Sequence, residues 1–103
     1  MAKTRIELQE ALEEFLGSRN VYYQPPESIK LKYPCILYER NRINTIPANN
    51  KAYLKNKDYS LTLIYREADS TLPDDILEAF DFISHDRSYK ADNLYHDVFT
   101  LIW

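Results

Sequence analysis

Residues 85–103 read HDRSYKADNLYHDVFTLIW, and this stretch decides how the fold is completed. Two runs rich in β-branched and aromatic residues are separated by Lys-Ala-Asp-Asn at 90–93, a polar sequence typical of a turn. The pattern predicts a β-hairpin with strands over residues 82–89 and 94–103.

Both predicted strands carry a His-Asp pair, His85-Asp86 and His96-Asp97. With the turn centred near Ala91, His85 faces Asp97 and Asp86 faces His96 across the hairpin. Successive strand residues point to opposite faces, so the two cross-strand pairs lie on opposite sides of the sheet. Neither side then collects the three or four ligands that zinc requires. We therefore expect a structural or interface role for these pairs, and no metal site.

The N-terminal region predicts a helix over residues 4–16. Thr4 followed by Glu7 has the form of a capping box. Gly17, the only glycine, stands where a helix C-cap needs a positive φ. One apolar stripe runs along this helix and is formed by Leu8, Leu12, Phe15 and Leu16.

A second helix is expected to begin near residues 70–75, which read STLPDD. The hydroxyl residues Ser70 and Thr71 are typical N-caps, Pro73 suits the first turn, and two aspartates favour the positive end of the helix dipole. The expected packing face of this helix is formed by Ile76, Leu77 and Phe80.

Three further strands precede this helix. The run at 20–24 is halted by two prolines and predicts an edge strand, and the run at 59–66 alternates with Tyr59, Leu61, Leu63 and Tyr65 on one face. Another strand is expected at 34–40. The order α-β-β-β-α-β-β predicts an α+β fold, with a mostly antiparallel sheet and two helices packed on one face.

Residues 41–57, NRINTIPANNKAYLKNK, form the expected connection between two of these strands. The segment is too long for a tight hairpin, and long connections in compact domains are usually functional or mobile. It is a candidate for an arm that reaches a neighbouring subunit.

Length and composition restrict the possible classes of protein. The 103 residues form one domain, 1–103, and 45% apolar content suffices for a core without metal or disulfide. A formal net charge of −3 with scattered basic residues argues against nucleic-acid binding. The single cysteine excludes an internal disulfide and suits a reducing compartment. The charged start MAKTRIELQE is unlike a signal peptide, and no run approaches a membrane span, so we expect a soluble protein made inside the cell.

No catalytic constellation stands out. Cys35 lies on an apolar strand and resembles a small core residue, and one glycine cannot make a phosphate-binding loop. We expect no enzyme and no cofactor. The alternative from another class is a small metal-dependent hydrolase that uses His85, Asp86, His96 and Asp97.

Two features favour protein–protein contact. Nine tyrosines exceed what one small core can hold, so several are expected at the surface, where tyrosine is typical of interfaces. An RNA-binding sheet would need flanking basic residues, which this chain supplies poorly.

The apolar run from Val98 to Trp103 predicts either a central strand or a strand covered by a partner subunit. Homo-oligomers are mostly closed, so a ring is expected.

The runs LQEALEEFLGSRNVYYQPPESIKLKYPCILYER, NNKAYLKNKDYSLTLIYRE and DRSYKADNLYHDVFTLIW resemble tail-terminator (tail-completion) proteins of long-tailed bacteriophages and prophages. The resemblance spans nearly the whole chain and has no catalytic signature. Head-completion and head–tail joining proteins of the phage neck are similar in size and remain an alternative.

The resemblance implies a structural α+β subunit of the virion tail or neck, made in the bacterial host cytoplasm. Such subunits form a hexameric ring that caps the tail tube and faces the head–tail connector. The implied partners are therefore further copies of the chain, the tail-tube protein and the connector protein, with no nucleic acid or membrane. The candidate interface residues are Asn44, Ile46, Asn49, Asn50, Tyr53, Leu54 and Trp103.

Overall fold

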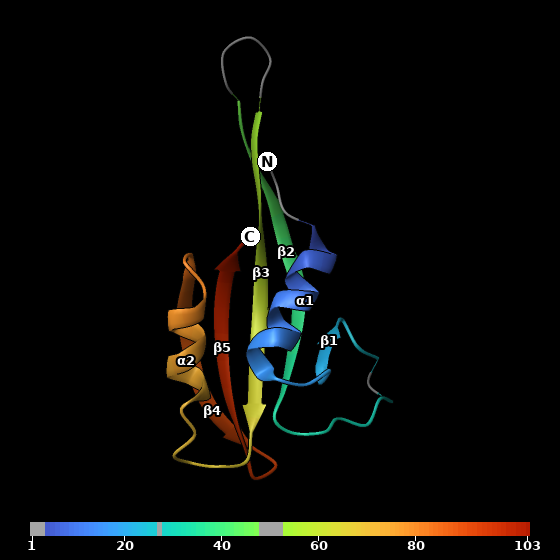
Figure 1. The fold of residues 1–103 in the computed structure, drawn as a ribbon, viewed down its shortest axis with the longest axis vertical. Helices are drawn as coiled ribbons and strands as arrows, with labels where there is room; N and C mark the ends of the chain where they lie inside the picture. Colours follow the sequence, from blue (N-terminus) through green and yellow to red (C-terminus); the bar gives the residue numbers. More distant parts are fainter. Residues whose placement is uncertain (1–3, 27, 48–52) are drawn as a thin grey trace.

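The computed structural model describes residues 4–26, 28–47 and 53–103, and for residues 42, 44–47 and 53–56 it describes the backbone alone. Two helices and five strands make one elongated molecule with extents of 53 × 27 × 22 Å (Figure 1). In chain order the elements are α1 (Arg5–Leu16), β1 (Val21–Tyr23), β2 (Cys35–Pro47), β3 (Tyr53–Tyr65), α2 (Leu72–Ala79), β4 (Ile83–Ala91) and β5 (Leu94–Ile102).

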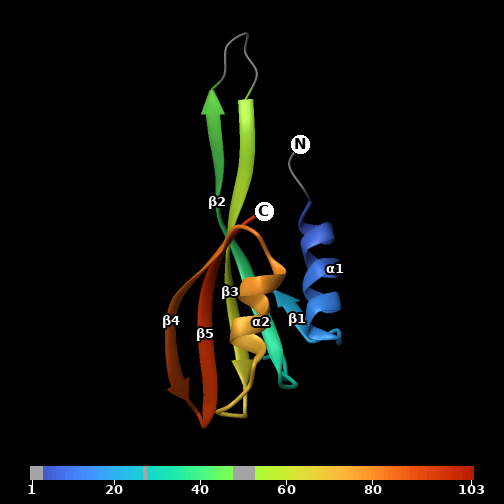
Figure 2. The same cartoon turned by 60° about the vertical axis from the view of Figure 1, so that its left-hand side comes forward.

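The five strands form a single sheet in the order β1-β2-β3-β5-β4. β1 runs parallel to β2, and every other neighbouring pair is antiparallel. Both helices lie on the same side of the sheet (Figure 2). The predicted α+β class, element order and one-sided helix packing are therefore confirmed, and β1 is an edge strand as expected.

The core lies between the helices and the alternating residues of the central strands. Tyr59, Leu61 and Leu63 of β3 are at most 1% exposed, because their side chains all point toward the helices. The other members of this cluster are Leu8, Leu12, Val21, Ile36, Tyr38, Ile76, Phe99 and Leu101. The predicted inner face of β3 is thus confirmed.

Helix α1 begins and ends as its sequence predicts. The Thr4 hydroxyl accepts from the Glu7 backbone N–H at 3.2 Å, while the Glu7 carboxylate accepts from the Thr4 N–H at 3.1 Å. Gly17 ends the helix with φ 74°, and its N–H donates to the Glu13 carbonyl at 2.9 Å. The capping box and the left-handed C-cap therefore delimit the helix.

Replacing Gly17 by Ala is expected to lower the free energy of unfolding by about 1 kcal/mol. A Cβ at this position would meet no atom within 4 Å, so the cost arises from the positive φ alone. Urea unfolding measures the loss. Gly17→Asn is the matched control and should lose less, because Asn tolerates the left-handed region; equal losses would contradict a conformational cause.

Helix α2 departs from expectation in two details. Thr71 occupies the N-cap but makes no capping bond, and its hydroxyl donates to the Asp75 carboxylate at 2.9 Å. Ser70 supplies the acceptor for the Leu72 N–H, at 3.3 Å. Ile76 is buried, whereas Leu77 is 37% exposed, because the short helix turns only one narrow face to the sheet. The prediction that Leu77 packs in the core was wrong.

The expected connection at residues 41–57 is largely strand. β2 and β3 each extend for 13 residues, and their pairing continues to Pro47 opposite Tyr53. Turn-forming Asn and a proline near its middle concealed these strands in the sequence, because two-residue alternation is weak there. An arm still results, since β2 and β3 project together well beyond the other strands (Figure 1).

The C-terminal strand β5 is central, between β3 and β4. Trp103 packs at the edge of the core, with its ring 6.2 Å from that of Phe80, and its Nε1 donates to the Thr4 carbonyl at 2.9 Å. Leu101 and Trp103 thus pack within the subunit, whereas Ile102 is 41% exposed.

Candidate functional site

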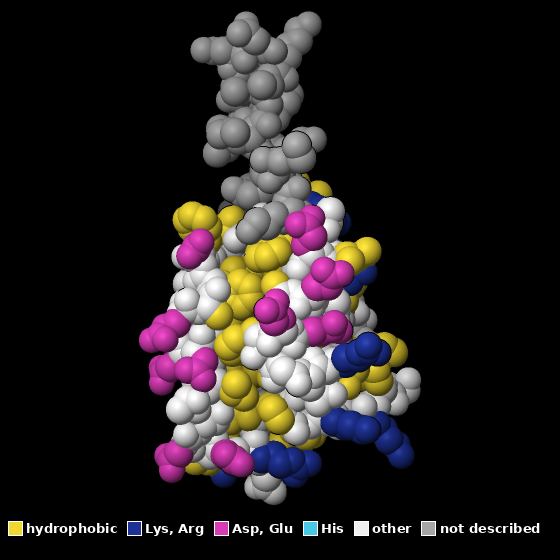
Figure 3. Space-filling view, viewed as in Figure 1, with side chains coloured by type: hydrophobic (Ala, Val, Ile, Leu, Met, Phe, Trp, Pro, Cys, Tyr) yellow, Lys and Arg dark blue, Asp and Glu magenta, His cyan; other side chains and the backbone are white. Residues whose placement is uncertain are grey.

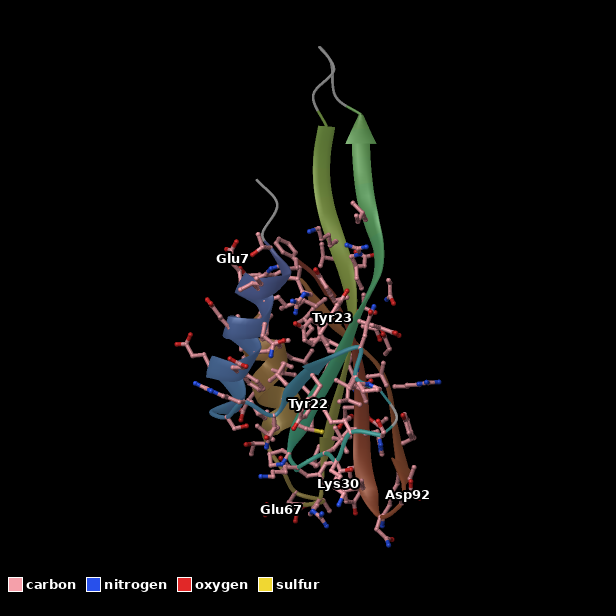
Figure 4. All side chains as sticks on the ribbon, turned by 90° about the vertical axis from the view of Figure 1, so that its right-hand side faces the viewer. Glu7, Tyr22, Tyr23, Lys30, Glu67 and Asp92 are labelled. Atoms are coloured by element: carbon pink, nitrogen blue, oxygen red, sulfur yellow. The ribbon has the colours of Figure 1, made fainter. Side chains whose placement is uncertain are left out.

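The β4–β5 hairpin turns later than the sequence suggests. Asp92 and Asn93 form a two-residue turn in which both φ angles are positive, at 53° and 62°, as a type I′ turn requires. This turn lies at the end of the molecule opposite the arm (Figure 4). The predicted turn centre at Ala91 was wrong, because Ala91 itself pairs with Leu94.

His85 and Asp97 nevertheless meet, although they are not directly opposed. The β4 register shifts between His85 and Arg87, which places His85 opposite Phe99. Nε2 of His85 lies 2.9 Å from Oδ1 of Asp97. The predicted contact between His85 and Asp97 therefore exists. The two residues meet diagonally across the shift in strand register, which the sequence does not signal.

Asp86 and His96 do not join this pair. Asp86 accepts a hydrogen bond from the Thr100 hydroxyl at 2.6 Å, and the His96 ring stacks on Tyr89 with centroids 4.6 Å apart. The predicted Asp86–His96 contact was thus wrong, because these residues are out of register. Within the described parts of the chain, no group of three or more His, Cys, Asp and Glu is placed to hold a metal ion.

Asp97 is the centre of a polar cluster drawn from three strands. Its side chain is buried at the helix-facing side of the sheet, with the residue 4% exposed. The Tyr65 hydroxyl donates to Oδ2 at 2.6 Å, and both the Ser88 hydroxyl and His85 Nε2 contact Oδ1. Sequence reasoning missed Tyr65 and Ser88, because only the observed register brings them to Asp97.

This environment shifts two pKa values in opposite directions. Burial raises the pKa of the Asp97 carboxyl, but hydrogen bonds from Ser88, Tyr65 and His85 outweigh burial and hold it below its usual value. Burial and the hydrogen bond to the Asp97 carboxylate raise the pKa of Tyr65 well above its ordinary 10.0. Asp97 is therefore an ionised carboxylate and Tyr65 a neutral phenol across the physiological pH range.

The cluster contains Ser, His and Asp but lacks the geometry of a hydrolase triad. In a triad the two imidazole nitrogens separately contact serine and aspartate. Here Ser88 Oγ, at 3.0 Å, and Asp97 Oδ1, at 2.9 Å, both contact Nε2 of His85. Ser88 also donates directly to Asp97, so its proton has no path through the histidine. This arrangement is suited to holding three strands together.

Cys35 is likewise placed as a core residue. It is fully buried, and burial raises the pKa of its thiol to about 11. A thiol in this state is a poor nucleophile at neutral pH. The sequence interpretation of Cys35 as a small apolar residue agrees with this environment.

One tyrosine of the described side chains is exposed, which is fewer than the composition suggests, because most of the others are partly or fully buried. Tyr89 on the edge strand β4 is 43% exposed and lies beneath the Arg87 guanidinium, 5.4 Å from the ring centroid. By contrast, Tyr38 and Tyr59 belong to the core. Tyrosines therefore divide between packing and a potential contact surface.

The predicted interface residues fall into three groups. Asn44, Ile46, Tyr53 and Leu54 lie on the projecting parts of β2 and β3, whose backbone pairs Asn44 with Asn56 and Ile46 with Leu54. Asn49 and Asn50 lie outside the described residues. Trp103 belongs to the body, where it contacts Phe80.

The described helices include none that is long and apolar enough to cross a membrane. Comparison of the sequence with known protein-family models and with curated proteins found no match in either.

Proposed function

We propose that the protein is a structural subunit of a phage or prophage tail, forming a ring that caps the tail tube and joins it to the head. The resemblance to tail-terminator proteins motivates the proposal. The structural feature that supports it is the projecting β2–β3 hairpin, which packs little against its own subunit and is available for contact with a neighbouring molecule.

The hairpin beyond the body is a two-stranded ribbon. Its five residue pairs run from Ile43–Lys57 to Pro47–Tyr53. β1 pairs with β2 only at Ile36 to Tyr38, and the pairing of β5 with β3 ends at Asp58. The Lys57 carbonyl still accepts from the Trp103 N–H, and beyond that point no third strand flanks the ribbon among the described residues. Two-stranded ribbons are marginally stable alone in water and offer unpaired backbone groups at both edges, so an interaction with another subunit would stabilise this one.

A ring of such subunits would act by contact, without a chemical step. One face binds the last layer of the tail tube, and the other differs from the tube's own growing surface. Further tube subunits are then excluded sterically, which ends tail growth and leaves the upper face available to the head connector.

The absolute mass in solution tests the proposal. Light scattering behind gel filtration, over a concentration series, is expected to give a species near six times the 12.3 kDa chain mass, either alone or after addition of tail tubes from the phage or prophage that encodes the chain. A chain that stays monomeric and binds no tube would contradict the proposal. Binding to heads but not to tubes would favour the head-completion alternative.

A further inference from the structure

Charge is divided unequally between the arm and the body. Residues 41–57 contain Arg42, Lys51, Lys55 and Lys57 and no acidic residue. Removing these four positive charges from the chain's net −3 leaves −7 on the remaining residues. A basic arm on an acidic body favours contact between an arm and the body of another copy.

The negative charge of the body is concentrated on the helices. α1 and α2 together carry seven carboxylates, which are Glu7, Glu10, Glu13, Glu14, Asp74, Asp75 and Glu78. Arg5 is the only basic residue in either helix. It is turned toward the sheet, where its guanidinium donates to the Tyr38 hydroxyl at 3.1 Å and covers the Tyr23 ring. The outward surface of the helices therefore keeps its negative charge.

An apolar groove of about 310 Å³ runs between the two helices. Ala11, Phe15, Ala79 and Phe80 line it, with Glu14 at its margin. The Phe15 and Phe80 rings meet edge to face, 6.4 Å apart. Figure 3 shows a strip of apolar side chains on this side of the molecule, with acidic side chains along both margins.

The arm complements the groove in chemical character and is long enough to cross it. Five residues of extended strand span about 17 Å, whereas the stretch of α1 that lines the groove, residues 11–15, spans about 8 Å. The ribbon combines basic residues with apolar ones, including Ile43, which is 48% exposed. It points away from the body beyond the helices of its own subunit, so its own groove is out of reach (Figures 1 and 2).

From this complementarity we infer that the groove between α1 and α2 receives the projecting β2–β3 ribbon of a second copy of the chain. In this contact the exposed Ile43 covers the aromatic floor, and the basic arm as a whole lies against the carboxylates at the margin. The contact is head-to-tail, so repetition can close a ring. The inference rests on the proposed ring function and names its receiving surface.

Charge reversal in the full chain tests the contact. The groove variant is Glu10→Lys with Glu14→Lys, and the arm variant is Lys55→Glu with Lys57→Glu. A control matched to the groove variant, Glu67→Lys with Asp69→Lys, makes the same charge change on an exposed loop, whose Glu67 lies at the end remote from the arm (Figure 4). Thermal unfolding checks that each variant is folded, and light scattering at low salt measures self-association.

The groove variant and the arm variant are each expected to weaken self-association at least about tenfold, and the control is expected to leave it nearly unchanged. Combining both reversals in one chain should restore association, because opposite charges again face each other. Groove and arm variants that associate like the control, or a combined variant no better than either parent, would overturn the inference and leave the ring proposal intact.

Two further results would distinguish the contact between arm and groove from a monomeric subunit and from an arm that binds nucleic acid. Wild-type chain that remains monomeric up to about 1 mM overturns the inference, whereas binding of that monomer to tail tubes would still support the proposed function. Loss of binding to a labelled mixed-sequence DNA duplex in the arm variant, with normal association of the groove variant, would assign the arm to nucleic acid instead.

Discussion

Replacing residues 45–55 by Asn-Gly is expected to give a folded monomer that no longer assembles. The removed pairs contact only each other along the described ladder, so the body keeps its core and its sheet. The hydrogen bond from the Trp103 N–H to the Lys57 carbonyl is also retained. We expect the free energy of unfolding to change by less than about 1 kcal/mol, since a lone ribbon adds little stability.

Self-association of this shortened chain is expected to fall at least about a hundredfold, which corresponds to about 2.7 kcal/mol. Light scattering measures the loss. Under the proposed function, complementation of a phage or prophage that lacks the protein would measure the consequence for tail completion. The control replaces Asp92-Asn93 by the same Asn-Gly dipeptide, which suits the type I′ turn at the opposite end. Normal assembly of the shortened chain would refute an assembly role for the arm.

Asp97→Asn is expected to lower the free energy of unfolding by about 2–3 kcal/mol. The carboxylate accepts from Tyr65, His85 and Ser88 in a buried position, and an amide has one oxygen with which to replace two. At least one donor then loses its acceptor. The change is large against the 5–15 kcal/mol that stabilises a typical domain, and urea unfolding near neutral pH measures it.

Asp86→Asn is the matched control on the same hairpin. Asp86 is exposed and accepts one hydrogen bond, from Thr100, so its loss is expected to stay below about 1 kcal/mol. Similar losses in the two variants would show that the buried cluster contributes no special stability.

The pH dependence of stability gives a second readout of the same cluster. Because folding lowers the pKa of Asp97, its contribution is present above the unfolded value near 3.8 and is lost as the pH falls through the folded value. Because folding raises the pKa of Tyr65, its contribution is present below 10.0 and is lost as the pH rises above that value. Asp97→Asn should remove the acid component, whereas Asp86→Asn should retain it.

Local signals predicted the elements whose limits depend on neighbouring residues. The capping box of Thr4 and Glu7 and the left-handed Gly17 delimit α1, because both involve groups within one helical turn. The alternation from Tyr59 to Tyr65 likewise predicted the inner face of β3. These features require no knowledge of distant contacts.

The sequence predictions were wrong where pairing between distant strand residues outweighed the local conformational preference of the segment. Residues 41–47 and 53–57 look like a polar connection, yet each strand supplies the hydrogen-bond partners that the other needs. The hairpin register depended on a turn at Asp92 and Asn93 and on a shift between His85 and Arg87. Displacing a turn by one or two positions changes every opposed pair, so the sequence alone could not place Ser88 against Asp97.

The sequence by itself determined the order of helices and strands and the acidic character of the helices, because propensity, capping and charge are properties of nearby residues. Tertiary structure alone decided that Tyr65, His85 and Ser88 converge on Asp97. It also decided that Phe15 and Phe80 line a groove between the two helices. Such sites bring together residues far apart in the chain, and their geometry follows from strand register and helix packing, which no local pattern encodes.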